Sequence, residues 1–119
     1  MSQVNMLITC DTLLKEIGEQ TGLNVYLSEA PRVESCIVYI YEPLYYNGAH
    51  NQIYLEVRII LEDESRIIEI EPLLMEKFIG LGDTQVIPNA TYVEQSTGGT
   101  ATDYTNHLVH FFYGFYIYF

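Results

Sequence analysis

The sequence predicts an α+β fold, an antiparallel sheet of about four to five strands with two helices packed on one face. The 119 residues suffice for a single domain with one core and are too few for two. Several segments alternate apolar and polar side chains with the period of two that is typical of strands, and two segments place apolar residues at helical steps of three and four. The expected order is α-β-β-β-α-β-β, which favours an α+β sandwich.

Residues 104–119 (YTNHLVHFFYGFYIYF) are expected to form one long strand that ends at the last residue. Neither side of this strand is polar, so we expect it to be central in its sheet or covered on both faces. The protein's own helices would cover one side, and a second copy of the chain or a bound partner would cover the other. A well-buried core strand is the alternative. Gly114 interrupts the aromatic row and predicts a bulge or a bend.

The first helix is expected at residues 6–21, where an apolar stripe faces a polar side. Gly22 would end this helix, and Ser2, Thr9 or Asp11 would cap its start. The stripe consists of Cys10, Leu13, Leu14 and Ile17.

Three strands are expected next, at residues 24–28, 35–46 and 53–62. Pro43 cannot donate a hydrogen bond to a neighbouring strand, so the far end of the second strand should be an edge, a bulge or a loop. Asn47 and Gly48 predict a reversal of the chain within residues 47–52. The third strand alternates most clearly, with one apolar face made of Ile53, Leu55, Val57, Ile59 and Leu61.

Residues 63–82 again carry apolar side chains at helical steps, but Pro72 lies among them. Inside a helix, proline removes a hydrogen bond and costs about 3 kcal/mol. Two interpretations remain open. We favour one helix kinked at Pro72, and the other is a strand at residues 66–71 followed by a helix that begins with Pro72. Residues 84–95 then predict an irregular strand with Pro88 at an edge or bulge, and residues 96–103 a flexible polar loop.

Composition narrows the classes of function. Sixteen acidic and five basic residues give a net charge of −11, which opposes binding to nucleic acid. The longest apolar run is far shorter than the roughly 20 residues of a membrane span. Two cysteines are too few for a disulfide framework, and MSQVNML does not resemble a signal peptide. We therefore expect a soluble protein of a reducing, cytoplasmic compartment, with no nucleic-acid or membrane partner.

The sequence contains no motif that is typical of catalysis, metal binding or cofactor binding. His107 and His110 would point to opposite faces of a strand, so they cannot form a metal pair there. The acidic residues of segment 62–71 lack the ligand spacing of a calcium loop. Nucleophile, phosphate-loop and dinucleotide motifs are absent, and Cys10 has no obvious base. We expect no catalytic residue, no metal ion and no cofactor.

Tyrosine is unusually frequent, with 11 in the chain and no tryptophan. Its ring gives a large apolar contact and its hydroxyl tolerates water, which suits a surface that is buried only after assembly. A tyrosine-rich sheet face is the simpler alternative. Pro43 and Pro88 indicate strand edges, and exposed strand edges also favour self-assembly.

Segments along nearly the whole chain resemble one family in order and length. They are KEIGEQTGLNVYLSEAP, YIYEPLYYNGAHNQ, IYLEVRIILED, MEKFIGLG and a C-terminal hairpin ending in aromatic residues. In this order they resemble the small tail-terminator and tail-completion proteins of long-tailed phages and prophages. The resemblance rests on element order without a diagnostic motif, and Pro72 departs from the smooth second helix of that pattern.

The resemblance implies a structural protein that forms a ring, typically a hexamer, at the head-proximal end of the tail. Its partners would be the tail tube protein and head connector proteins, and it would occupy the bacterial cytoplasm during assembly and the virion tail or neck afterwards. DNA would slide through a negative lumen. We expect a docking loop at Ser96, Thr97, Gly98, Gly99 and Thr100. We expect subunit or partner contacts at Tyr41, Tyr45, Tyr46, Tyr54, Phe112, Tyr116 and Tyr118.

Other classes remain open at this point. A head-tail connector, a neck protein or a minor capsid adaptor would share the acidity and the small α+β fold. A small-molecule-binding domain would need a closed pocket with convergent polar groups.

Overall fold

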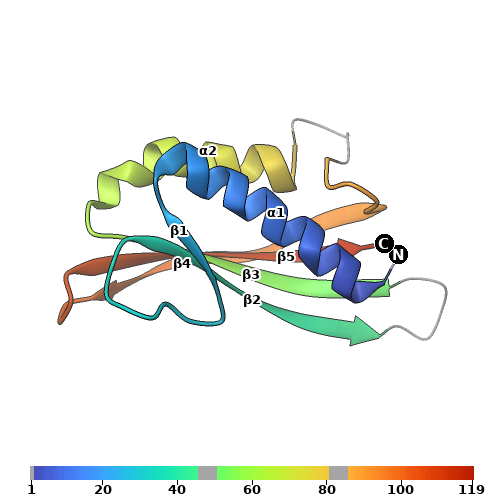
Figure 1. Ribbon diagram of the computed structural model, residues 1–119, viewed down its shortest axis with the longest axis horizontal. Coiled ribbons are helices and arrows are strands. Elements are labelled where there is room, and N and C mark those ends of the chain that lie inside the picture. Colours follow the sequence, from blue (N-terminus) through green and yellow to red (C-terminus); the bar gives the residue numbers. More distant parts are fainter. Residues whose placement is uncertain (1, 46–50, 81–85) are drawn as a thin grey trace.

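Two helices lie on one face of a five-stranded sheet in the computed structural model, which describes residues 2–45, 51–80 and 86–119 (Figure 1). The α+β fold with both helices on one side is therefore confirmed. The strands follow the order β1-β2-β3-β5-β4 across the sheet. The elements are α1 (Gln3–Thr21), β1 (Asn24–Leu27), β2 (Cys36–Tyr45), β3 (Asn51–Leu61), the 3₁₀ turn η1 (Glu64–Arg66), α2 (Ile67–Phe78), β4 (Tyr92–Asp103) and β5 (Leu108–Tyr118).

The sheet is mixed, so the expectation of a purely antiparallel sheet was wrong at one edge. β1 runs parallel to β2, whereas the β2–β3, β3–β5 and β5–β4 pairs are antiparallel. A parallel neighbour requires the chain to return to the end where the first strand began. β1 is short enough for residues 28–35 to make this return without a helix.

α1 begins earlier than the apolar stripe indicated. The Ser2 side chain accepts a hydrogen bond from the Asn5 N–H and caps the helix. Gly22 ends it in the left-handed conformation, with φ of 75°, which confirms the expected stop.

Pro72 lies inside α2, so the helix interpretation of this segment is confirmed and the strand at residues 66–71 was wrong. Pro72 and Ile68 are both exposed. Water can therefore reach the Ile68 carbonyl, which loses its partner four residues later. Packing secures the helix on its other side, where Ile70, Leu74 and Phe78 are buried and the Phe78 ring stacks on Phe115.

The C-terminal hairpin differs from the sequence prediction at both strands. β5 begins at Leu108, because Asp103 accepts hydrogen bonds from the N–H groups of Thr105 and Asn106 and closes a turn there. The polar segment 96–103 is part of β4 and no flexible loop. Pairing with β5 overrides its weak strand propensity. Pro88 lies in a turn before β4, so it does not mark a strand edge, and residues 84 and 85 fall outside the described chain.

One continuous core lies between the helices and the sheet, and polar contacts tie the two layers together. The Tyr39 hydroxyl of β2 donates to Asp11 of α1 at 2.6 Å, and the Tyr113 hydroxyl of β5 donates to Glu71 of α2. Burial raises the pKa of both tyrosines, and the carboxylates raise it further, so both hydroxyls remain donors. Neither helix in the described chain combines the length and the apolar character that a membrane crossing requires.

A substitution at Gly18 tests how closely α1 approaches β1. A Cβ atom at Gly18 would lie 2.6 Å from the Leu23 carbonyl oxygen and 2.9 Å from Val25 Cγ2. We expect Gly18→Ala to lower the free energy of unfolding by about 1–3 kcal/mol, since overpacking costs this much and outweighs the helix propensity of alanine. Urea denaturation followed by circular dichroism measures the change.

Gly99→Ala is the matched control, because no atom lies within 4 Å of its Cβ position. We expect it to change the free energy of unfolding by less than about 0.5 kcal/mol. Equal midpoints for the two variants would contradict the close approach at Gly18.

Candidate functional site

The helices leave one face of the sheet uncovered, and aromatic side chains gather there. We call this surface the open face. It lies opposite the buried row of Ile53, Leu55 and Val57 in β3, because side chains alternate between the two faces of a strand. Its members include Ile40 and Glu42 of β2, Tyr54, Glu56 and Arg58 of β3, Tyr92 and Glu94 of β4, and His110, Phe112, Tyr116 and Tyr118 of β5.

The aromatic rings of the open face are in contact across the strands. The ring centroids of Tyr54 and Tyr116 lie 5.0 Å apart, and those of Tyr92 and Tyr118 lie 5.7 Å apart. The Arg58 guanidinium lies 4.4 Å from the centroid of Phe112, in the arrangement of a cation–π contact. These contacts fix the rings in place, and each of these rings belongs to a residue that is partly or fully exposed. The open face is therefore a preformed aromatic surface.

Gly114 makes room for this arrangement. A Cβ atom there would lie 2.4 Å from the Tyr54 hydroxyl oxygen, so the absence of a side chain lets the Tyr54 ring lie across β5. β5 pairs with β3 without interruption at Gly114. The expected irregularity lies instead in the neighbouring strand, where the register of β4 shifts between Gln95 and Gly98.

The structure brings together only some of the predicted contact residues. Phe112, Tyr116, Tyr118 and Tyr54 share the open face. Tyr41 lies opposite Leu55 and therefore on the helix side, so the expected tyrosine cluster at the turn is not one surface.

Of two other predicted contact residues, the structure describes one. Tyr45 lies in β2 next to Asn51, whereas Tyr46 and the rest of the turn to residue 50 fall outside the described residues. The predicted docking loop, residues 96–100, is the middle of β4.

Arg58, His110 and Tyr92 also belong to the open face, although they were not among the predicted contact residues. The alternation of residues 53–62 already placed Arg58 beside Tyr54 and carried the signal for it. Tyr92 was not identified as a contact residue, because its strand was predicted to begin at residue 84 and in fact begins at Tyr92.

β4 is the outermost strand at one end of the sheet in the described structure. Its backbone N–H and C=O groups on that side therefore lack a neighbouring strand. Natural edge strands are commonly protected by lysine or proline, and β4 contains neither. Glu94 and Asp103 are its only charged residues. The register shift near its middle is the one protective feature of this edge.

At the other end of the sheet, β1 covers only residues 36–39 of β2. The Tyr39 carbonyl accepts the Ser28 N–H at 2.9 Å on this outer side. By the alternation of strand hydrogen bonds, Tyr41 and Pro43 also face outward. Pro43 thus occupies an edge, which was one of its expected positions.

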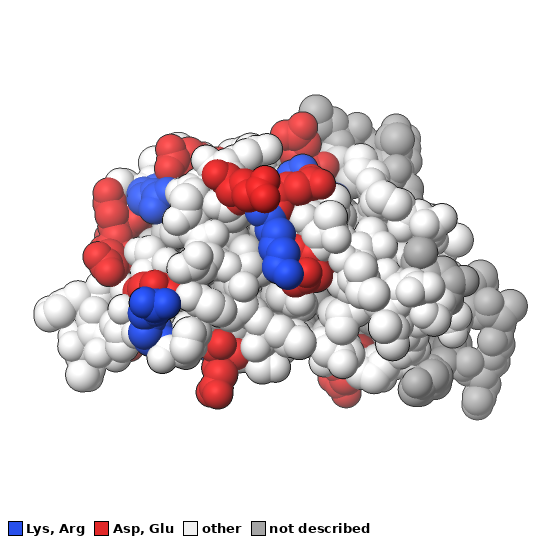
Figure 2. All heavy atoms as spheres, viewed as in Figure 1, with Lys and Arg blue, Asp and Glu red and all other residues white. Residues whose placement is uncertain are grey.

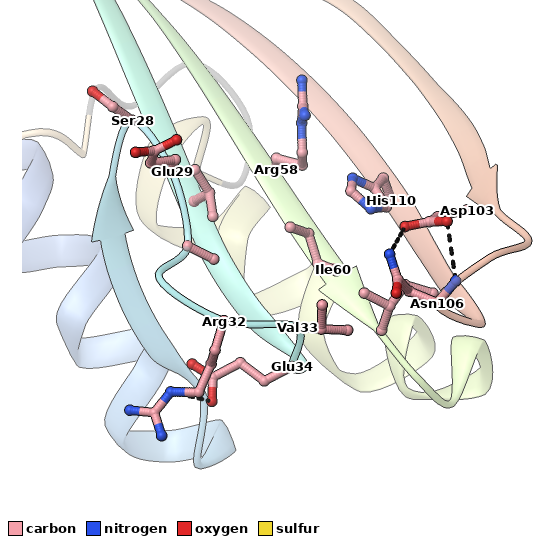
Figure 3. A pocket seen from close by; sticks show the side chains of 13 residues that line it. Ser28, Glu29, Arg32, Val33, Glu34, Arg58, Ile60, Asp103, Asn106 and His110 are labelled. Carbon is pink, nitrogen blue, oxygen red and sulfur yellow. Dashed lines mark hydrogen bonds and ion pairs between the residues drawn. The ribbon is translucent and has the colours of Figure 1, made fainter.

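A hollow of about 240 Å³ lies at one end of the open face, between loop 28–35 and the turn after β4 (Figure 3). Its floor is apolar and includes Val38, Ile60 and Leu108, which pack together beneath the loop. Burial lowers the pKa of His110 at its rim, and the positive charge of Arg58 lowers it further, whereas Asp103 acts in the opposite direction.

The described residues bring together no group that resembles a catalytic centre. They contain no cluster of three or more His, Cys, Asp or Glu side chains able to hold a metal ion. Cys10 and Cys36 are free and buried. Burial raises the pKa of Cys10 to about 12, and burial together with the charge of Glu34 raises that of Cys36 to about 11. Both residues are thiols at neutral pH, which is typical of unreactive cysteines.

Comparison of the chain with models of known protein families and with curated protein sequences finds no match. The functional argument therefore depends on the geometry of the open face and of the sheet edges.

Replacing Arg58 tests the electrostatics of the hollow. The Arg58 charge disfavours protonation of His110, so we expect Arg58→Gln to raise the pKa of His110. NMR titration of the His110 ring protons measures the shift. Arg32→Gln is the matched control, since Arg32 also lines the hollow but lies in the loop. It should leave the pKa of His110 unchanged. A pKa that stays constant in Arg58→Gln would contradict this placement of the two side chains.

Proposed function

We propose that this protein is a non-enzymatic assembly subunit whose open face is covered by another protein chain in the finished structure. The observation that carries the proposal is the preformed aromatic surface on the face that the helices leave uncovered. Tyr92 is 56% exposed although its ring packs against Tyr118. Ordered, half-buried tyrosines are favourable contacts for a protein partner, because little side-chain entropy is lost when they are covered.

Among assembly proteins, we propose the class of phage tail terminators or tail-completion proteins. The support is the resemblance in element order and length, together with a small α+β fold that has surfaces for assembly and no cluster of catalytic groups in its described part. In this role the protein forms a ring, by the resemblance a hexamer, at the head-proximal end of the tail. The open face contacts the tail tube or the connector of the head.

The distribution of charge agrees with a structure that DNA passes without adhering. Acidic side chains gather over the two helices and the turn that precedes α2, as the upper part of Figure 2 shows. The cations of this layer are neutralised within it, since Lys15, Arg66 and Lys77 pair with Asp11, Glu69 and Glu16. A surface of this kind repels a polyanion. The remaining acidic residues of the layer are Glu19, Glu62, Asp63, Glu64, Glu71 and Glu76.

Recruitment to purified tail tubes tests this function. We expect wild-type protein to bind one end of the tube, visible by electron microscopy and by co-sedimentation. Tyr92→Ser should weaken this binding at least tenfold, which corresponds to about 1.4 kcal/mol, because it removes an exposed ring from the open face. Size-exclusion chromatography with light scattering would report the size of any ring in solution.

Tyr104→Ser is the matched control, since Tyr104 is 83% exposed but lies in the turn between β4 and β5. It should bind as the wild-type protein does. Equal loss in both variants, or no loss in either, would contradict a role for the open face. Binding to head connectors in the absence of tail tubes would instead indicate a connector or neck protein.

A further inference from the structure

The two ends of the sheet differ, and each has a surface that the fold leaves uncovered. At one end, β4 presents an unpaired backbone edge whose middle part, residues 96–102, carries only small uncharged residues. At the other end, on the helix side, four apolar side chains are exposed. Their exposed fractions are 66% for Val4, 57% for Ile8, 48% for Leu27 and 43% for Tyr41. We call these four residues the apolar band.

Two residues of the apolar band border a shallow hollow of about 370 Å³ between α1, β1 and β2. Ile8 and Leu27 line this hollow, and the Tyr39 ring lies beside them. Asp11 and Lys15 are its charged residues, and they neutralise each other because Lys15 Nζ lies 2.8 Å from Asp11 Oδ2. Exposed apolar side chains beside a hollow are typical of an interaction site.

The net charge of the chain limits which surfaces of two copies can come into contact. With a net charge of −11, most pairs of surfaces would repel each other. The β4 edge and the apolar band carry the least charge, since Glu94 and Asp103 are the only charged residues of β4 and the hollow beside the band contains only an internal ion pair. Figure 2 shows this difference on the side of α1, where few charged atoms cover the N-terminal half of that helix and the neighbouring part of β2.

Strand direction also fits a contact between opposite ends of the sheet. β2 is antiparallel to β3, β3 to β5 and β5 to β4, so β4 and β2 run in opposite directions. A rotation about an axis close to the strand direction preserves these directions. The strand pairs place residues 92–95 of β4 at the level of residues 41–44 of β2. This part of β4 would then lie antiparallel to the residues of β2 in the next copy that β1 leaves uncovered. The backbone of Tyr41 offers a donor and an acceptor at this edge, and Pro43 offers an acceptor only.

We propose that copies of this chain join head to tail, with the β4 edge of one copy seated against β2 and the apolar band of the next. The proposal rests on the proposed assembly function and names the surface by which subunits meet. A two-fold contact between two β4 edges would leave the apolar band exposed, whereas the head-to-tail contact covers both surfaces in every subunit. Head-to-tail contacts close into rings when the rotation permits.

Chemical cross-linking tests the contact directly. Glu94→Cys places a thiol on β4 and Glu42→Cys places one on the uncovered part of β2. Both positions are exposed, lie on the open-face side of the sheet and share one level along the strands through Tyr54 and Tyr116. A short bis-maleimide can join neighbouring strands at this level, and the buried Cys10 and Cys36 provide the unreactive background. We expect covalent dimers when the two single variants are mixed, little product from either variant alone, and a ladder of oligomers from the double variant. Efficient dimers from Glu94→Cys alone would overturn the proposal in favour of a two-fold contact.

A second pair of variants tests the apolar band. Ile8→Glu should weaken self-association more than tenfold in light scattering, because it places a charge in the contact. Ile68→Glu is the matched control, since Ile68 is 78% exposed but lies on α2 outside the band, and it should associate as the wild-type protein does. Circular dichroism verifies that both variants fold. Equal association of the two variants would overturn the proposal.

The outcomes separate this inference from the proposed function. Recruitment to tail tubes without mixed cross-links would leave the function in place and overturn the head-to-tail contact. Mixed cross-links without recruitment would support the contact and contradict the tail role. A chain that stays monomeric at every concentration, in the presence and absence of tail tubes, would overturn both.

Discussion

The constraint on which this structure depends is that two helices can cover only one face of a five-stranded sheet. α1 and α2 pack against the face formed by the alternate apolar residues of β2, β3 and β5. Loop 28–35 shields one end of the other face, where Cys36, Val38, Ile60 and Leu108 are buried. No described segment remains to cover the rest. The aromatic rings there gain contacts from one another, which keeps the open face ordered while it is uncovered.

Tyrosine serves two separate purposes in this fold. Tyr39 and Tyr113 face the helices and donate to carboxylates on α1 and α2, so their hydroxyl groups fix the helices to the sheet. Burial by itself would raise the pKa of Asp11, but its hydrogen bonds with Lys15 and Tyr39 outweigh that effect and lower it. The carboxylate form is therefore the one that the Tyr39 bond stabilises. The tyrosines of the open face instead contact other rings.

The alternation of side chains predicted the faces of β3 and β5 correctly, because the side-chain period of a strand is a local property. It could not show that Tyr41 and Tyr54 lie on opposite faces of the sheet, since that depends on the register of β2 against β3. It missed the part of β4 from residue 96 onward, because glycine, serine and threonine in residues 96–102 are typical of loops. Only pairing with the strongly hydrophobic β5 makes that segment a strand.

The candidate site was predictable in part for the same reason. Phe112, Tyr116 and Tyr118 share a face by period alone, and the structure adds Tyr54 from the adjacent strand. Arg58 and Tyr92 join them through strand pairing, a long-range contact that no local pattern contains. The apolar band depends on the packing of α1 beside β1, which likewise requires the complete fold.

The register shift in β4 also limits how the free chain can aggregate. It divides the outer edge into Tyr92–Gln95 and Gly98–Asp103, two short pieces that do not share one regular hydrogen-bonding row. Fibril growth needs long, regular segments of high strand propensity and few glycines. An edge interrupted in this way can pair with one complementary neighbour, but it is a poor template for the repeated addition of strands. The chain can therefore keep an unpaired strand edge without offering a regular template for amyloid growth.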